Sequence, residues 1–213
     1  MLTLYQQQDS GNCYKPRLLL AHLGLPFGVV DIDANDGSTR APDYLARNPN
    51  GKVPLLEFGD GRRLAESNAI LLHLGEGTPF LPKDAFDRAK VYEWLFFEQY
   101  SHEPTIAVRR SLTIYPARRA QATPEVMAKL HRAGNNALGV MEARLATADW
   151  LAGEDFSIAD MALYAYTHMA GEGGLRPCGF SRHCLLARPH CRAARACDDR
   201  LAARTGLTRI LSA

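Results

Sequence analysis

Apolar and polar positions follow two different periods along this chain of 213 residues. Up to about residue 76, short alternating or wholly apolar runs, typical of β-strands, are interspersed with runs of helical period. They predict strands at residues 2–5, 29–32, 53–58 and 62–65, the last two joined by the turn Asp60-Gly61. They predict helices at residues 13–23, 42–47 and 67–74. We therefore expect an α/β half of βαβ-ββα order.

Beyond a segment punctuated by proline and glycine, from Glu76 to Lys83, only the helical period persists. It predicts helices and no convincing strand, at residues 87–101, 104–115, 124–147 and 157–170. Ser157 and Asp160 have the spacing of a capping box, and Phe156 before them is half of a hydrophobic staple. The expected organisation is an α/β domain, a linker and an all-helical domain, at residues 1–76, 77–86 and 87–213.

Composition narrows the class of protein. With 46% apolar residues and no long uncharged apolar run, we expect one large or two small domains and no membrane span. The chain enters its first strand without a basic and then apolar leader, so we expect no secretory signal and a cytoplasmic location. The formal net charge of +2 divides unevenly, because residues 175–213 hold eight arginines and two aspartates and so carry +6, which leaves −4 for residues 1–174.

Four of the five cysteines lie in that basic tail, at positions 178, 184, 191 and 197. Their separations of six, seven and six residues match no zinc-binding pattern, and a disulfide framework is out of place in a cytosolic chain. We therefore expect neither a metal site nor disulfides. The sequence contains no phosphate-binding glycine loop and no Ser-His-Asp order, and its basic tail lacks interleaved aromatic residues, so no nucleic-acid partner is expected.

The pair Glu66-Ser67 begins the last predicted helix of the first half. A helix N-terminus leaves its first N–H groups unpaired and partly positive, so an acid and a hydroxyl there can hold the charged groups of a small zwitterion. Taken alone, the pair favours the simpler interpretation that Ser67 caps the helix. Here it follows, at a spacing of about a dozen residues, the segment Asn48-Pro49-Asn50-Gly51-Lys52-Val53-Pro54-Leu55-Leu56.

In this combination the chain resembles the glutathione transferase family over about residues 1–174. The resemblance implies a thioredoxin-like first domain followed by a helical-bundle domain, an α/β plus all-α fold. It implies that Ser67 receives the γ-glutamyl carboxylate of glutathione and that Glu66 helps to hold its ammonium group. It also assigns Ser157 and Asp160 to folding, because the capping box of the family nucleates a buried helix.

Val53-Pro54 resembles the cis-proline corner of this family. Such a corner turns the backbone of Val53 toward the ligand, so that its N–H and C=O pair with the cysteinyl part of glutathione. Lys52, Arg40 and Thr39 are the candidates for binding the glycine carboxylate, although the family often has His or Lys near the last two positions. A solvated face is the alternative interpretation for all three.

Glutathione must lose its thiol proton before it attacks an electrophile, since a free thiol of pKa about 8.5 is mostly protonated near neutrality. In this family the residue that stabilises the thiolate lies in the loop before the first helix, here Asp9-Ser10-Gly11-Asn12-Cys13-Tyr14-Lys15. Ser10 matches the serine of the theta- and delta-like classes, and Asn12 matches a bacterial subclass whose loop reads Thr-Pro-Asn. Either can lead, and both would act electrostatically, without a covalent bond. The structural alternative makes Ser10 an N-cap and Asn12 a turn former.

Two neighbouring residues are less suitable sulfur donors. Cys13 is predicted to lie in the first turn of a helix, where the pKa of a thiol can be lowered. However, the cysteine-type transferases carry their cysteine where Ser10 stands, and no Cys-x-x-Cys motif occurs, so Cys13 is interpreted as structural. Tyr5 lies in the predicted first strand and is expected to pack.

The resemblance implies a homodimeric detoxification enzyme, a glutathione transferase that adds glutathione to a small hydrophobic electrophile bound between the two domains. The polar residues expected to reach that acceptor are Tyr100, His102, Glu103 and Arg109. A glutathione-dependent disulfide reductase or peroxidase is the second possibility. A non-catalytic, transferase-like binding scaffold is the third, and the complete thiol site argues against it.

The resemblance stops at about Gly174. Transferases of this kind usually end with an apolar Phe-Pro-Ala-Ile turn and an amphipathic helix containing Trp-Leu, whereas this chain continues with Leu175-Arg176-Pro177-Cys178 and arginine-rich sequence. When residues 175–197 are back-translated with chosen GC-rich synonymous codons, advancing by one base gives a string that contains both missing features, so the sequence permits a shifted reading frame. We therefore expect residues 175–213 to be a frameshift product, an irregular tail with one helix at 189–203. The alternative is a genuine variant of the family.

Overall fold

The structure is a computed structural model that describes residues 1–176. The predicted helix at 189–203, the tail cysteines and all but the first two residues of the expected frameshift product lie outside the described residues. Leu175, at the start of that tail, is buried against the helical core. Among the described residues, no helix has the length and apolar character needed to cross a membrane.

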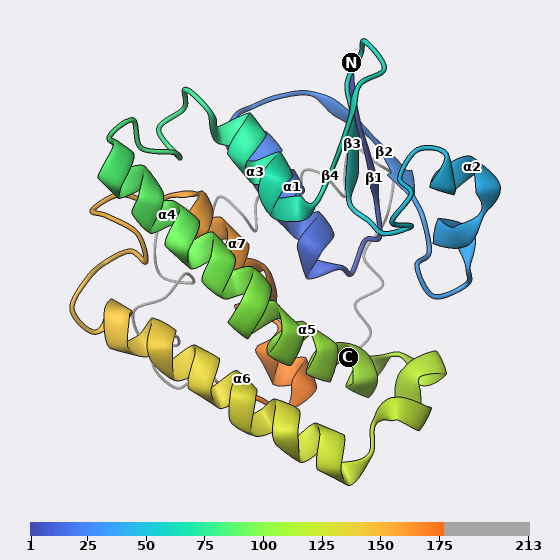
Figure 1. Cartoon of the computed structure of the whole chain (residues 1–213), viewed down its shortest axis with the longest axis vertical. Coiled ribbons are helices and arrows are strands. Elements are labelled where there is room, and N and C mark those ends of the chain that lie inside the picture. The colour runs from blue at the N-terminus through green and yellow to red at the C-terminus, as the bar shows by residue number, and fades with distance from the viewer. Residues whose placement is uncertain (177–213) are drawn as a thin grey trace, which may run out of the picture.

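A four-stranded mixed sheet forms the first domain (Figure 1). In the spatial order β2-β1-β3-β4, its strands are Phe27–Asp31, Leu2–Gln6, Leu55–Glu57 and Arg63–Ala65. β1 pairs in parallel with β2 and antiparallel with β3, which also pairs antiparallel with β4. The predicted βαβ-ββα order is confirmed. β3 begins later than predicted because Pro54 has no N–H to donate to the ladder.

Helices cover both faces of this sheet: α1 (Gly11–His22), α2 (Pro42–Leu45) and α3 (Ser67–Gly75). Leu4 of β1 packs with Ile70 of α3, and α1 lies beside α3 on that face (Figure 1). The next residue, Tyr5, points to the opposite face and packs edge-on against Tyr44 of α2. Tyr5 is therefore a packing residue, as predicted.

The second domain is helical, with α4 (Ala85–Phe97), α5 (Glu103–Ile114), α6 (Pro124–Leu145) and α7 (Ile158–Thr167). The predicted break between α4 and α5 is replaced by a π-helical turn, Glu98–His102, which joins them into one run (Figure 1). Pro104 has no N–H to donate, and its ring would clash with a carbonyl of a regular α-turn, which accounts for the wider turn before it. Shorter 3-10 segments lie at Ser38–Arg40, Pro116–Gln121 and Ala170–Gly173.

One hydrophobic core joins the two domains. Leu19 of α1 and Leu71 of α3 belong to the same buried cluster as Ile106 of α5 and Met161 of α7. α1 therefore packs on its own sheet domain through α3 and on the helical domain through α7. The loop that precedes α1 consequently lies where the two domains meet.

The predicted capping box at the start of α7 is confirmed. Asp160 Oδ2 accepts hydrogen bonds from the backbone N–H and the hydroxyl of Ser157, both at 2.9 Å, and Oδ1 accepts from the N–H of Leu151 at 2.9 Å. Burial raises the pKa of Asp160 to about 6. The carboxylate thus ties the loop before α7 to its first turn, which is a folding role.

Candidate functional site

The two predicted sulfur donors lie where the loop after β1 enters α1. Ser10 is the N-cap of α1, and its Oγ accepts a hydrogen bond from the backbone N–H of Cys13 at 3.4 Å. Asn12 follows in the first turn. Cys13 is fully buried, and burial raises the pKa of its thiol. That thiol stays protonated and inert near neutrality, as expected of a structural cysteine.

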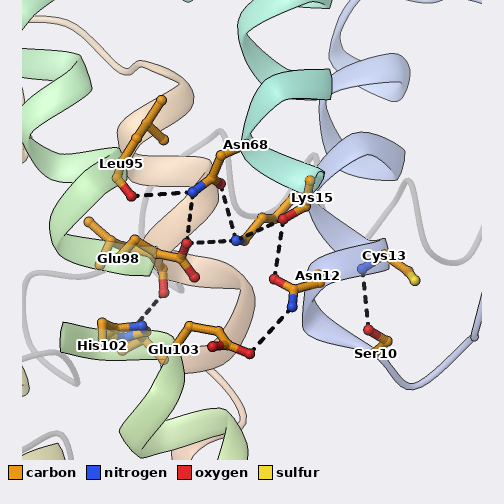
Figure 2. Close-up of polar contacts among 12 residues, drawn as sticks. Ser10, Asn12, Cys13, Lys15, Asn68, Leu95, Glu98, His102 and Glu103 are labelled. Carbon is orange, nitrogen blue, oxygen red and sulfur yellow. Dashed lines mark hydrogen bonds and ion pairs between the residues drawn. The ribbon is translucent and has the colours of Figure 1, made fainter. Parts of the chain in front are cut away.

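The side-chain amide of Asn12 is held between two helices (Figure 2). Its Oδ1 accepts from the hydroxyl of Ser67, the first residue of α3, at 3.3 Å, and its Nδ2 donates to Oε1 of Glu103, the first residue of α5, at 3.4 Å. Burial and the nearby charge of Glu98 raise the pKa of Glu103. Asn12 therefore connects the thiol loop to both domains and is more than a turn former.

A buried ion pair lies beside this amide (Figure 2). Lys15 Nζ is 2.8 Å from Oε2 of Glu98, and both side chains are fully buried. The same ammonium donates to Oγ of Ser67 at 3.2 Å and to Oδ1 of Asn68 at 3.1 Å, so the Ser67 hydroxyl proton is available for Asn12. Sequence reasoning missed this pair because its members lie far apart along the chain and belong to no motif.

Tyr166 of α7 is a third side chain beside the thiol loop, and it too was missed. It lines the same cavity as Ser10, and its ring lies so close to Gly11 that a Cβ there would be 2.7 Å from Cε1 of the ring. Burial and the charge of Glu103 raise the pKa of Tyr166, while hydrogen bonding to the Ser10 side chain and the Asn12 backbone opposes that rise. A tyrosine within an apolar helix resembles a core residue, so the pattern did not single it out.

The opposite wall begins at the Val53-Pro54 bond, which is cis, as predicted. Tyr44 Oη and Asn48 Nδ2 each donate to the backbone carbonyl of Lys52 at 2.7 Å. Because two side chains hold this carbonyl, the backbone that enters the corner is fixed in place.

Glu66 has a backbone φ of 67°, in the left-handed region that residues with a side chain rarely adopt. Its carboxylate accepts a hydrogen bond from Asn50 Nδ2 at 3.5 Å. Strained residues of this kind concentrate at ligand-binding sites, where the surrounding structure holds them in place. Glu66 therefore stays a candidate ligand-binding residue, and its predicted role stays a prediction.

A cavity of about 450 Å³ lies between these walls. Predicted site residues on its lining are Ser10, Asn12, Thr39, Arg40, Lys52, Val53 and Glu103. The remaining lining residues are Gln7, Ala34, Asn35, Gly37, Gly51, Ala107, Val108, Arg110, Ser111, Tyr115, Arg118 and Tyr166. Pro54, Glu66 and Ser67 do not line it, although Ser67 contacts Asn12. Within residues 1–176, no group of three or more His, Cys, Asp or Glu is placed to hold a metal ion.

Three residues predicted to bind the second substrate lie outside this cavity. Tyr100 is 88% exposed. His102 is fully buried with Nε2 2.8 Å from Oγ1 of Thr167, and burial together with the charge of Lys15 lowers its pKa to about 3. Arg109 donates to backbone carbonyls of the segments that pack on α5. The structure gives His102 and Arg109 packing roles in place of the predicted ones.

Comparison with known proteins identifies the family. The model of the glutathione S-transferase N-terminal domain matches residues 1–76, and that of the C-terminal domain matches residues 105–179. The chain belongs to the glutathione S-transferase family. The crystal structure of a glutathione S-transferase from Pseudomonas fluorescens Pf-5 is similar at a TM-score of 0.80 and 44% identity, with 99% of each chain covered. Glutathione S-transferase 3 of Zea mays is 32% identical over 198 residues, 90% of this chain and 86% of that protein.

This member of the glutathione S-transferase family is also similar to Ure2 proteins. Protein URE2 of Eremothecium gossypii is 32% identical over 153 residues, 68% of this chain but 42% of that protein, so the chain spans less than half of its length. The structure of Ure2p in complex with glutathione has a TM-score of 0.77 at 26% identity, with 91% of this chain and 92% of that chain covered. The family and the fold expected from the sequence are thus confirmed.

Proposed function

We propose that this protein binds glutathione and stabilises its thiolate for transfer to a small electrophile. One observation carries the proposal: Ser10 and Asn12, at the N-terminus of α1, line the same cavity as Lys52 and Val53 of the cis-proline corner. A thiolate against a helix N-terminus is stabilised by the unpaired N–H groups and by fixed side-chain donors. The complex of the related Ure2p with glutathione supports the choice of thiol.

Each part of glutathione has a partner in this proposal. The backbone of Val53 pairs with the cysteinyl residue, and Lys52 and Arg40 bind the glycine carboxylate. Glu66 and Ser67 do not line the cavity, and in this proposal they bind the γ-glutamyl end where it extends past Asn12 toward α3. The Ser67 hydroxyl then exchanges its hydrogen bond with Asn12 for one with the carboxylate, which couples binding at α3 to the amide beside the sulfur.

Disulfide reduction is the second candidate, and the presence of Asn12 in the thiol loop favours it. The same thiolate attacks one sulfur of a mixed disulfide, a new S–S bond to glutathione forms as the original S–S bond breaks, and the other sulfur leaves as a thiolate that takes up a proton. Assays with a chloronitroaromatic acceptor, a mixed disulfide and a hydroperoxide separate transfer from reduction. Glutathione binding without activity in any of the three indicates a binding protein.

The first prediction tests whether Ser10 and Asn12 lower the pKa of the bound glutathione thiol. In the Ser10→Ala, Asn12→Ala double variant, the pKa of bound glutathione should return toward the free-thiol value of about 8.5, because both side-chain donors to the sulfur are gone. Titrating the ultraviolet absorbance of the thiolate in wild-type and variant complexes measures the shift. Asn135→Ala, an exposed change on α6, is the control and should leave the titration unchanged. Coincident curves for wild type and double variant would show that another group activates the sulfur.

The second prediction concerns a homodimer. α4 and the π turn leave Phe86, Phe96 and Tyr100 72%, 73% and 88% exposed, an apolar surface that a second copy would cover. We propose that the sheet domain of one subunit packs on this surface of the other. Light scattering should give the mass of a dimer at micromolar concentration, and Phe96→Asp should shift it toward the monomer. A monomeric wild-type protein would contradict this.

A further inference from the structure

The family resemblance implies a hydrophobic acceptor, but the side of the cavity formed by α5 and the segment after it carries mostly polar side chains. Its wall on α5 and the following segment presents Arg110, Ser111, Tyr115 and Arg118, and the apolar side chains on this wall are the small residues Ala107 and Val108. A pocket for an apolar electrophile would be lined predominantly by larger apolar and aromatic side chains.

Most charged groups on this side already have partners. Arg110 donates to Oε2 of Glu172 at 2.6 Å, and its side chain is nearly buried. Asp9, next to the thiol loop, accepts from the hydroxyl of Tyr115 at 2.7 Å and from Nε2 of Gln7 at 2.8 Å. Burial and this carboxylate raise the pKa of Tyr115 to about 12, so Tyr115 remains a donor.

Arg118 is different. Its Nη1 donates to the neutral hydroxyl of Ser111 at 2.6 Å, and it forms no ion pair within the described part of the chain. The side chain is half-buried on the cavity wall. A guanidinium that is partly desolvated and lacks an acidic partner binds a carboxylate with paired, charge-assisted hydrogen bonds.

We propose that the second substrate is an electrophile with a carboxylate, and that Arg118, steadied by Ser111, binds this group and determines acceptor specificity. The inference rests on the proposed glutathione transfer. Because Ser10 and Arg118 line one cavity of about 450 Å³, a small acceptor can contact Arg118 while its reactive carbon meets the sulfur. In the reaction a C–S bond forms at that carbon and the leaving group departs with the bonding electron pair.

The test compares two acceptors that differ in charge, 4-chloro-3-nitrobenzoate and its neutral analogue 4-chloro-3-nitrobenzamide. The wild type should prefer the benzoate in kcat/KM, with each rate divided by the spontaneous reaction with glutathione. Arg118→Gln should lower this preference about tenfold or more through KM, since a hydrogen-bonded charged group is lost. Arg118→Lys should retain part of it. Arg119→Gln is the control, because this neighbouring arginine is exposed and does not line the cavity.

A second measurement is independent of turnover. Calorimetry with the two conjugates, S-(4-carboxy-2-nitrophenyl)glutathione and its carbamoyl analogue, should show tighter binding of the carboxylate in the wild type but not in Arg118→Gln, with affinity for glutathione itself unchanged. Equal binding of both conjugates by the wild type, or a preference that survives in Arg118→Gln, overturns the inference. Turnover of the benzamide without preference for the benzoate also overturns it and leaves the proposed transfer intact. Failure to bind glutathione overturns the proposed function.

Discussion

Replacing Lys15 with methionine should lower the free energy of unfolding by about 3–5 kcal/mol, because it leaves the Glu98 carboxylate buried without its cation. The loss extends beyond the pair, since Ser67 and Asn68 both accept hydrogen bonds from the same ammonium. Urea denaturation of wild type and variant measures the difference. Lys90→Met is the matched control: Lys90 pairs with Glu93 at 2.6 Å, but their side chains are 40% and 61% exposed, so the cost should stay below about 1 kcal/mol.

The double variant Lys15→Met, Glu98→Met separates an unpaired charge from a general packing defect. If the cost of Lys15→Met comes from the orphaned carboxylate, removing both charges should be less destabilising than removing the lysine alone. A double variant worse than the single, or a single variant within about 1 kcal/mol of wild type, would contradict this account. Either result would show that the Lys15–Glu98 ion pair does not stabilise the packing of α1 against the π turn.

Several residues that line the cavity could be picked out from the sequence because they belong to local motifs. Ser10 and Asn12 lie two residues apart at the start of α1, and Lys52 and Val53 belong to one proline corner, so a short stretch of chain determines how each pair lies. The βαβ-ββα order of the elements could be predicted for the same reason, from strand periods and from the hairpin turn at Asp60-Gly61.

What could not be predicted depends on contacts between distant segments. In the sequence, Lys15 is one polar residue of a predicted helix, and nothing near it in the chain indicates a partner. The folded structure places Glu98, at the start of the π turn, against it. The helical period shows which residues share a face but not which face meets the cavity. The π turn Glu98–His102 also widens the helix locally, and this rotates the faces on either side relative to a regular α-helix. His102 therefore lies in the core, whereas the adjacent Glu103 reaches Asn12.

Gly11→Ala should be the other strongly damaging change, and it should affect the sulfur site as well as stability. The new Cβ would lie 2.7 Å from Cε1 of Tyr166 and 2.8 Å from the backbone oxygen of Ala165, and neither can yield easily, since one is a buried ring and the other is main chain. Overpacking of this kind costs about 1–3 kcal/mol. It should also displace Tyr166 from the loop that carries Ser10 and Asn12, so the thiolate of bound glutathione should form at a higher pH than in the wild type.

The control for this change is the same substitution at Gly139, on the exposed face of α6, where a Cβ meets no atom within 4 Å. Because alanine is a better helix former than glycine, Gly139→Ala should raise the free energy of unfolding by up to about 1 kcal/mol. Thermal denaturation should therefore shift in opposite directions for the two glycines, and only Gly11→Ala should alter the thiolate titration. If Gly11→Ala proved as stable as the wild type, with an unchanged titration, Tyr166 would not be packed tightly against the start of α1, and its place beside the sulfur donors would have to be abandoned.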